Sequence, residues 1–90
     1  MNKRANYIYE LFGQVNSKQL KKKKNGQPFY QLTVVLVKEK TKKINAFTDS
    51  LKRKDIWKEI EQSNYVGKKY LFYCQNWMGS YYLMDWKELT

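Results

Sequence analysis

Two groups of side chains in this 90-residue sequence have the chemistry to bind another molecule. The first is a run of four consecutive lysines in a polar segment, namely Lys21, Lys22, Lys23 and Lys24. Like charges packed so densely repel one another, so stability alone gives no reason to cluster them. Such ammonium groups bind phosphates, and the release of counterions supplies the affinity. The alternative is a solvated loop that is rich in lysine because the whole chain is.

The second group consists of aromatic rings beside amides and cations. Phe29 and Phe47 fall on the predicted non-core faces of two strands. Their neighbours on those faces are Gln31, Thr33, Lys43 and Asn45. Such surroundings are typical of a platform on which nucleic-acid bases stack, each stack contributing about 1–3 kcal/mol. The alternative is a register shift of one residue, which would exchange the two faces and bury one of these rings.

A second turn, over residues 76–80, carries further aromatic candidates. Trp77 lies in this turn, where an exposed indole has little structural reason to be, so we interpret it as a stacking residue. Tyr81 follows the turn and is a further candidate. Other large rings are assigned to the core: Trp57, Tyr70, Phe72 and Trp86.

Catalytic and metal-binding chemistry finds little support in the sequence. There is no histidine, which removes the commonest general base, most zinc-ligand sets and the Ser-His-Asp triad. The single Cys74 alternates with Tyr70 and Phe72, a pattern typical of a small buried residue. Four acidic residues are better interpreted as helix caps and surface charges than as a catalytic pair: Asp49, Asp55, Glu59 and Glu61. We therefore expect no enzymatic activity, no cofactor and no metal site.

The composition indicates one small folded domain over residues 1–90. Eighteen basic residues against eight acidic ones give a net charge of +10, while 42% hydrophobic and 17% aromatic residues exceed what a disordered basic tail contains. No segment approaches the roughly 20 apolar residues of a membrane span. No apolar segment of the kind found in secretory signals follows the first four residues. With a lone cysteine, these features predict an intracellular protein without a membrane partner.

Hydrophobic periodicity and turn residues predict five strands and one helix. The strands cover residues 6–15, 28–37, 43–48, 68–75 and 81–86, and a helix follows Asp49 and Ser50 through about residue 63. Gly13 is expected at a bend or bulge of the first strand. Asn25-Gly26 is the strongest short-range signal for a hairpin between the first two strands.

The order of these elements predicts the fold class. Alternation in the second strand places Tyr30, Leu32, Val34 and Leu36 on the core face. Five strands with one helix between the third and the fourth is the order of the OB-fold, an all-β barrel. An SH3-like barrel is the rival, although it rarely carries a three-turn helix at this place. In an OB-fold, the lysine run and the turn with Trp77 would flank the binding groove.

Three segments resemble the family of single-stranded DNA-binding proteins and primosomal replication proteins. Residues 44–48 are similar to that family's third strand, which runs directly into its helix. Residues 65–73 are similar to its turn and fourth strand, and residues 11–15 to its first strand. The resemblance implies an OB-fold that binds single-stranded DNA and forms a homodimer through the first-strand region. Tyr7, Tyr9 and Leu11 would supply an apolar strand face for that contact.

Residue usage indicates an AT-rich genome. Phe, Tyr, Met, Ile, Asn and Lys, which have AT-rich codons, total 42 residues, whereas Gly, Ala, Arg and Pro total 9. The chain is also similar to small plastid-encoded proteins of algae in the same superfamily. We therefore expect it in a plastid or in the cytoplasm of an organism with an AT-rich genome.

The leading hypothesis for function is binding of single-stranded nucleic acid without dependence on sequence, with DNA favoured, in replication or related DNA metabolism. Lysines would follow the phosphates while aromatic rings stack on the bases. A second hypothesis is a primosome or replisome interaction module whose basic face docks an acidic protein. A third is an RNA-binding OB protein, because nothing in the sequence reports on the 2′-hydroxyl.

Overall fold

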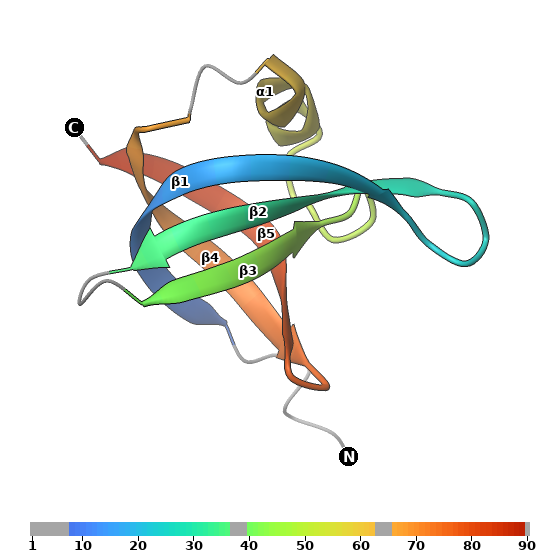
Figure 1. Cartoon of the computed structure of the whole chain (residues 1–90), viewed down its shortest axis with the longest axis horizontal. Helices are drawn as coiled ribbons and strands as arrows, with labels where there is room; N and C mark the ends of the chain where they lie inside the picture. Colours follow the sequence, from blue (N-terminus) through green and yellow to red (C-terminus); the bar gives the residue numbers. More distant parts are fainter. Residues whose placement is uncertain (1–7, 37–39, 63–65, 90) are drawn as a thin grey trace.

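The strands predicted from the sequence wrap into a closed barrel in the computed structural model, which describes residues 8–36, 40–62 and 66–89 (Figure 1). The elements are β1 (Tyr9–Lys22), β2 (Pro28–Leu36), β3 (Thr41–Ala46), α1 (Asp55–Gln62), β4 (Lys69–Trp77) and β5 (Ser80–Leu89). Predicted ends at Asn6, Val37 and Ser63 lie outside the described residues.

The strand order around the barrel is β1-β2-β3-β5-β4, and β4 pairs again with β1 to close it. Neighbouring strands are antiparallel except β3 and β5, which pair in parallel through Ile44 with Tyr81 and Asn45 with Tyr82. The single helix lies between β3 and β4. The fold is therefore all-β with one short helix and OB-like, as the sequence predicted.

Strand β1 is the longest of the described elements because it pairs with two neighbouring strands. Its first half, from Tyr9 to Gln14, pairs with β4, and its second half, from Gly13 onward, pairs with β2. At Gly13 the strands approach so closely that a Cβ would lie 2.7 Å from both Val34 Cγ1 and the Val35 carbonyl oxygen. Gly13 is thus required by close packing, and the irregular pairing that was expected there falls between Val15 and Ser17.

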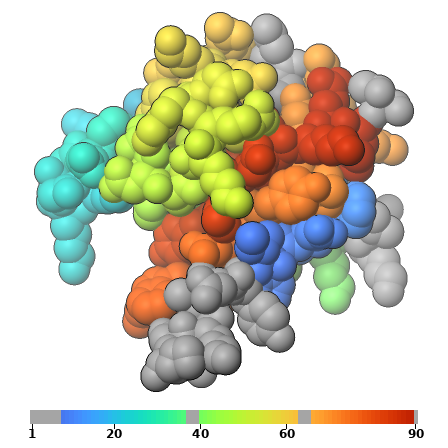
Figure 2. Space-filling view, turned by 180° about the vertical axis from the view of Figure 1, so that it is seen from behind, coloured from blue at the N-terminus to red at the C-terminus, as the bar shows by residue number. Residues whose placement is uncertain are grey.

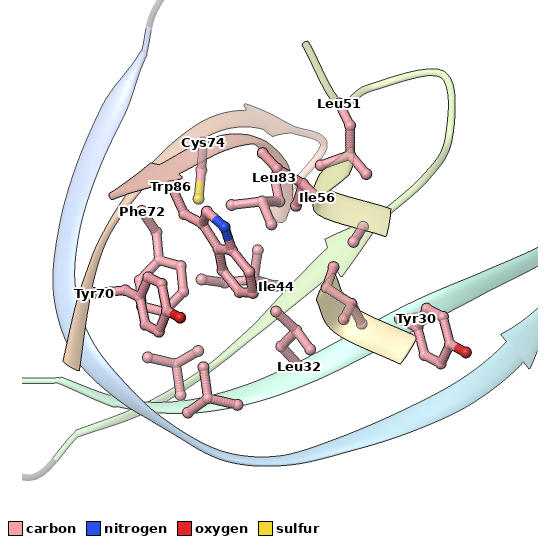
Figure 3. Packing of buried hydrophobic residues seen from close by; sticks show 14 residues of the cluster. Tyr30, Leu32, Ile44, Leu51, Ile56, Tyr70, Phe72, Cys74, Leu83 and Trp86 are labelled. Atoms are coloured by element: carbon pink, nitrogen blue, oxygen red, sulfur yellow. The ribbon is translucent and has the colours of Figure 1, made fainter. Parts of the chain in front are cut away.

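The barrel interior is filled by the residues that alternation assigned to it. Tyr30, Leu32 and Val34 are buried, and Leu36 packs against them while partly exposed. Figure 3 shows Tyr70, Phe72 and Trp86 gathered in one part of this core. The Tyr70 and Trp86 rings stack with centroids 4.4 Å apart. The other buried members are Val15, Ile44, Ala46, Leu51, Ile56, Ile60, Cys74 and Leu83.

Helix α1 covers one part of the barrel with a single apolar stripe. Ile56 and Ile60 are buried, and Trp57 packs at the edge with its ring 4.8 Å from that of Tyr30. The helix begins at Asp55, later than predicted, because residues 48–50 form a turn instead. It spans eight residues, and none of the described helical segments is long and apolar enough to cross a membrane.

Lys18 ties β1 to the end of this helix. Its ammonium donates hydrogen bonds to the carbonyl oxygens of Ile60 and Glu61, both at 2.8 Å, and lies 5.2 Å from the Tyr30 ring centroid. The last carbonyls of a helix have no partner within the helix, and a lysine placed there also meets the negative end of the helix dipole. Lys18 is therefore a structural lysine, although it lies only three residues before the lysine run.

Candidate nucleic-acid interface

Three aromatic rings form a continuous platform on the outside of the barrel. Phe47, directly after β3, meets Phe29 of β2 edge to face, with ring centroids 4.7 Å apart. On its other side Phe47 meets Tyr82 of β5 at 5.2 Å. All three rings are partly exposed. We call Phe29, Phe47 and Tyr82 the aromatic platform.

The faces of β2 and β3 are those expected from alternation. Tyr30 and Ala46 are buried, which places their chain neighbours Phe29 and Phe47 on the outside. The alternative of a one-residue register shift is therefore excluded. Beside the platform, Gln31 Nε2 donates a hydrogen bond of 3.0 Å to Asn45 Oδ1. Because Asn45 and Tyr82 are cross-strand partners, this amide pair leads directly to the platform.

The lysine run reaches this platform. Lys21 and Lys22 end β1, whereas Lys23 and Lys24 enter the turn, so only half of the run lies at the hairpin tip. Figure 2 shows the hairpin projecting from one side of the molecule next to the segment that follows β3. Lys23 Nζ lies 4.4 Å from the Phe47 ring centroid and 3.9 Å from the Asp49 carboxylate.

Lys21 reaches the platform through strand pairing, since its cross-strand partner is Phe29. The hairpin holds its shape through Asn25, whose Oδ1 accepts a hydrogen bond from the Gln27 amide, and through Gly26 at φ 89°. Positive φ is accessible to glycine without steric cost. The Asn25-Gly26 signal therefore marks the hairpin that carries the lysines.

A hollow of about 420 Å³ opens beside the platform. It is lined by Phe47, Asp49, Ser50, Gln75, Asn76, Trp77 and Tyr82. Trp77 is the last residue of β4, one position before the Met78-Gly79 turn, and it is 53% exposed. The indole therefore stands at the wall of the hollow.

The turn after β3 fixes the position of Phe47. Ser50 Oγ accepts a hydrogen bond from the Phe47 amide at 3.2 Å. The carbonyl oxygens of Phe47 and Leu83 both lie within hydrogen-bond distance of the same hydroxyl, which donates to them. Leu51, one residue later, is anchored in the core. The backbone of Phe47 is thus tied to β5 through Ser50.

The remaining two predicted site residues lie apart from this group. Tyr81 faces the core side of β5, where its ring meets Tyr9 edge-on at 5.8 Å and Lys42 Nζ at 5.6 Å. Lys43 is exposed on β3, opposite Thr33 of β2. It extends the basic surface alongside the platform without contributing a ring contact.

Sequence reasoning missed Tyr82, and the reason is a bulge in β5. Tyr73 pairs with Asp85 but Cys74 pairs with Leu83, so Met84 is an extra residue. Strict alternation from the buried Trp86 would turn Tyr82 inward and Tyr81 outward. The bulge reverses both assignments, because an extra residue exchanges the faces beyond it.

Charge is distributed unevenly along the chain. Residues 11–48 contain nine lysines and one acidic residue, whereas residues 49–90 contain seven basic and six acidic residues. In the second region Arg53 forms ion pairs with Asp55 and Asp85. Its hydrogen bond to Asp85 raises the pKa of Arg53 above its ordinary value. Among the described lysines of β1 to β3 and their turns, Lys23 alone forms an ion pair. The hairpin side therefore carries most of the uncompensated positive charge.

Neither metal binding nor thiol chemistry has a site in the described part of the chain. No three His, Cys, Asp or Glu side chains within it come close enough to hold a metal ion. Cys74 is fully buried, and burial raises the pKa of its thiol to about 12. A thiol in that state is not an effective nucleophile near neutral pH.

Comparison with known proteins gives no family assignment. The sequence matches no protein-family model, and no curated protein matches it. The interpretation of the site therefore depends on its own residues and their geometry.

Proposed function

We propose that this protein binds single-stranded nucleic acid, DNA in preference to RNA, without general dependence on sequence. The observation that carries the proposal is the junction of the aromatic platform with the lysine hairpin, where Lys23 Nζ lies 4.4 Å from the Phe47 ring centroid. Partly exposed rings beside cations are the combination that sequence-tolerant single-strand binding requires. Replication or related DNA metabolism is the process in which such binding is used.

The two groups of residues would divide the work. Lysines of the hairpin neutralise phosphates and release counterions, which gives affinity that falls with salt. Rings of the platform and Trp77 stack on bases, each adding about 1–3 kcal/mol. Lys23 covers the Phe47 ring in the unbound protein. A base that stacks on Phe47 takes that position, and the displaced ammonium becomes available to a phosphate.

Tryptophan fluorescence tests this proposal directly. Trp77 is the exposed indole at the hollow, whereas Trp86 is buried and Trp57 packs on Tyr30. Addition of a short oligo-dT should quench emission, and oligo-U should do so at higher concentration. The Trp77→Phe variant serves as the control, since it should lose most of the change while still binding. Absence of any response to both oligonucleotides would contradict the proposal.

A protein-interaction module of a primosome or replisome is the second candidate. The observation that favours it is the excess of lysines in residues 11–48, which attracts any polyanion, an acidic protein included. A module that docks an acidic protein would bind it mainly through the lysines. It predicts that Phe47→Ala leaves partner binding intact, whereas single-strand binding requires the ring.

Family membership, a plastid location and a homodimer belong to the same proposal. For the homodimer, Tyr9 is 40% exposed at the start of β1, and its neighbours Ile8 and Phe12 are 45% and 49% exposed. Leu11 packs against the barrel's own core, and Tyr7 lies outside the described residues. The exposed apolar surface that this end of the chain offers to a second copy is therefore formed by Ile8 and Phe12, because Tyr9 lies on the opposite face of the strand, against Tyr81. Sedimentation that gives only the monomer mass at tens of micromolar would exclude the dimer.

A further inference from the structure

The hollow beside the platform has the size and walls of a site for a single nucleobase. Its volume of about 420 Å³ lies within the range of about 300–1,000 Å³ that small-molecule pockets occupy. Phe47, Tyr82 and Trp77 supply three aromatic walls. The polar lining residues lie on the turn after β3 and at the end of β4.

The polar groups of the hollow differ in what they can still bind. The Ser50 hydroxyl is committed to the backbone at Phe47 and Leu83, so it serves the fold. Asp49, by contrast, presents a side chain that is 77% exposed and makes a single ion pair, with Lys23 at 3.9 Å. An ionised carboxylate only accepts hydrogen bonds. Asp49 therefore brings an acceptor to a surface whose other charges are positive.

A carboxylate at this position discriminates between the parts of a nucleotide. It repels phosphate, which directs the base rather than the backbone into the hollow. Carboxylates accept hydrogen bonds from base amino groups, as they do from N4 of cytosine. Thymine and uracil have no amino group, and their single N3–H lies between two carbonyl oxygens that a carboxylate repels.

We propose that this hollow is a base-reading subsite that takes one amino-bearing base in preference to thymine or uracil, with Asp49 as the specificity-determining residue. Stacking on the platform stays tolerant of sequence, and the preference acts at one position of the bound strand. This inference rests on the proposed function and adds a chemical preference at the same site.

The test compares two oligonucleotides that differ in one base. A short oligo-dT is titrated against the same oligo-dT with one central dC, at one salt concentration and neutral pH. Because both bases are pyrimidines, stacking changes little, and the amino group is the main difference. The wild-type protein should bind the dC-containing strand about three- to tenfold more tightly, which is the net effect of one typical hydrogen bond.

Two variants locate the source of the difference. Asp49→Ala should bind oligo-dT more tightly, because a repulsive charge is lost, and the ratio of the two affinities should fall to about 1. Glu61→Ala removes the same charge from an exposed position at the end of α1, outside the hollow, and should keep the preference. Circular dichroism establishes that both variants are folded.

Three results would overturn the inference. Equal binding of the two strands by the wild-type protein, or a preference that survives in Asp49→Ala, would remove the base-reading subsite and leave the proposed function standing. Failure to bind either strand would remove both. The ratio of affinities thus separates the two claims.

Discussion

The two sides of this barrel use the same residue types in opposite ways. On the helix side, the basic residue Arg53 is paired with Asp85 and large aromatic rings are buried, as in the stacked rings of Tyr70 and Trp86. On the hairpin side, most of the described lysines lack an acidic partner and the rings of Phe29 and Phe47 reach the surface. The contrast shows that residue type alone does not mark a binding site. The partners of each side chain decide its role.

The strongest contrast lies between two tryptophans. Trp86→Ala removes a buried ring that stacks on Tyr70 and donates through Nε1 to Glu59 at 3.0 Å, so it should lower the free energy of unfolding by about 3–5 kcal/mol. Trp77→Ala, an exposed position, should change stability by less than about 0.5 kcal/mol. Its binding of oligo-dT should weaken by about 1–3 kcal/mol. Urea unfolding and oligonucleotide titration of both variants measure these effects, and equal loss of stability would contradict the assignment.

The next contrast separates the platform from the neighbouring ring on the other face. Phe47→Ala should weaken binding of oligo-dT by about 1–3 kcal/mol without changing its salt dependence, because no charge is removed. Tyr81→Ala is the matched control, since Tyr81 packs toward the core and should affect stability more than binding. Titration at several salt concentrations tests both. A larger binding loss for Tyr81 than for Phe47 would reverse the assignment of the faces.

A third contrast lies within the lysines of one strand. Lys18→Met removes two hydrogen bonds to the end of α1 and should lower the free energy of unfolding by about 1–2 kcal/mol, with little effect on binding. Changing Lys21 through Lys24 to Gln should leave stability nearly unchanged.

The same fourfold variant should flatten the dependence of log affinity on log salt. If the run contacts about three phosphates, the slope should decrease by about 2 units. Unchanged affinity and slope would mean that the lysine run is a solvated loop. The basic groove would then be sought along Lys42 and Lys43 of β3 and Lys68 and Lys69 at β4.

The smallest expected effect is the dependence of stability on pH that arises from buried groups of the core. Burial raises the pKa of Cys74 from 9.0 to about 12, and raises those of Tyr30 and Tyr70. A raised pKa in the folded state means that the unfolded chain loses its proton first as pH rises. The contribution of these three groups to stability should therefore be constant below about pH 8 and fall above it, by about 1 kcal/mol at pH 10 from Cys74. Urea unfolding of wild type and Cys74→Ala checks this, and an identical decline in both would contradict the role of the thiol.

Periodicity predicted much of the fold because burial follows it closely. Tyr30 to Val34 and Tyr70 to Cys74 alternate strictly, and both runs lie in the barrel as expected. The helix start was wrong by several residues, since the turn at Phe47 and Ser50 depends on a hydroxyl contact with β5 that no local pattern encodes. Long-range contacts set that boundary.

The candidate site was predicted as separate parts whose contacts the sequence did not contain. Lys23 and Phe47 lie 24 positions apart, and only the hairpin geometry brings them together. Tyr82 was missed because the bulge at Met84 leaves no mark in the pattern of apolar residues. Lys18 and Lys23 look alike in sequence, yet one caps a helix and the other covers a platform ring.

The central claim is that exposed rings, rather than charge alone, bind the nucleic acid. The most direct measurement compares the affinity of the wild-type protein for an oligo-dT and for a hairpin duplex with the same number of phosphates, at one salt concentration. Lysines attract both forms, whereas Phe47, Tyr82 and Trp77 can stack only on unpaired bases. Base stacking predicts clearly tighter binding of the single strand, with the difference reduced in Phe47→Ala. Equal affinity for the two forms would contradict it and leave only electrostatic attraction.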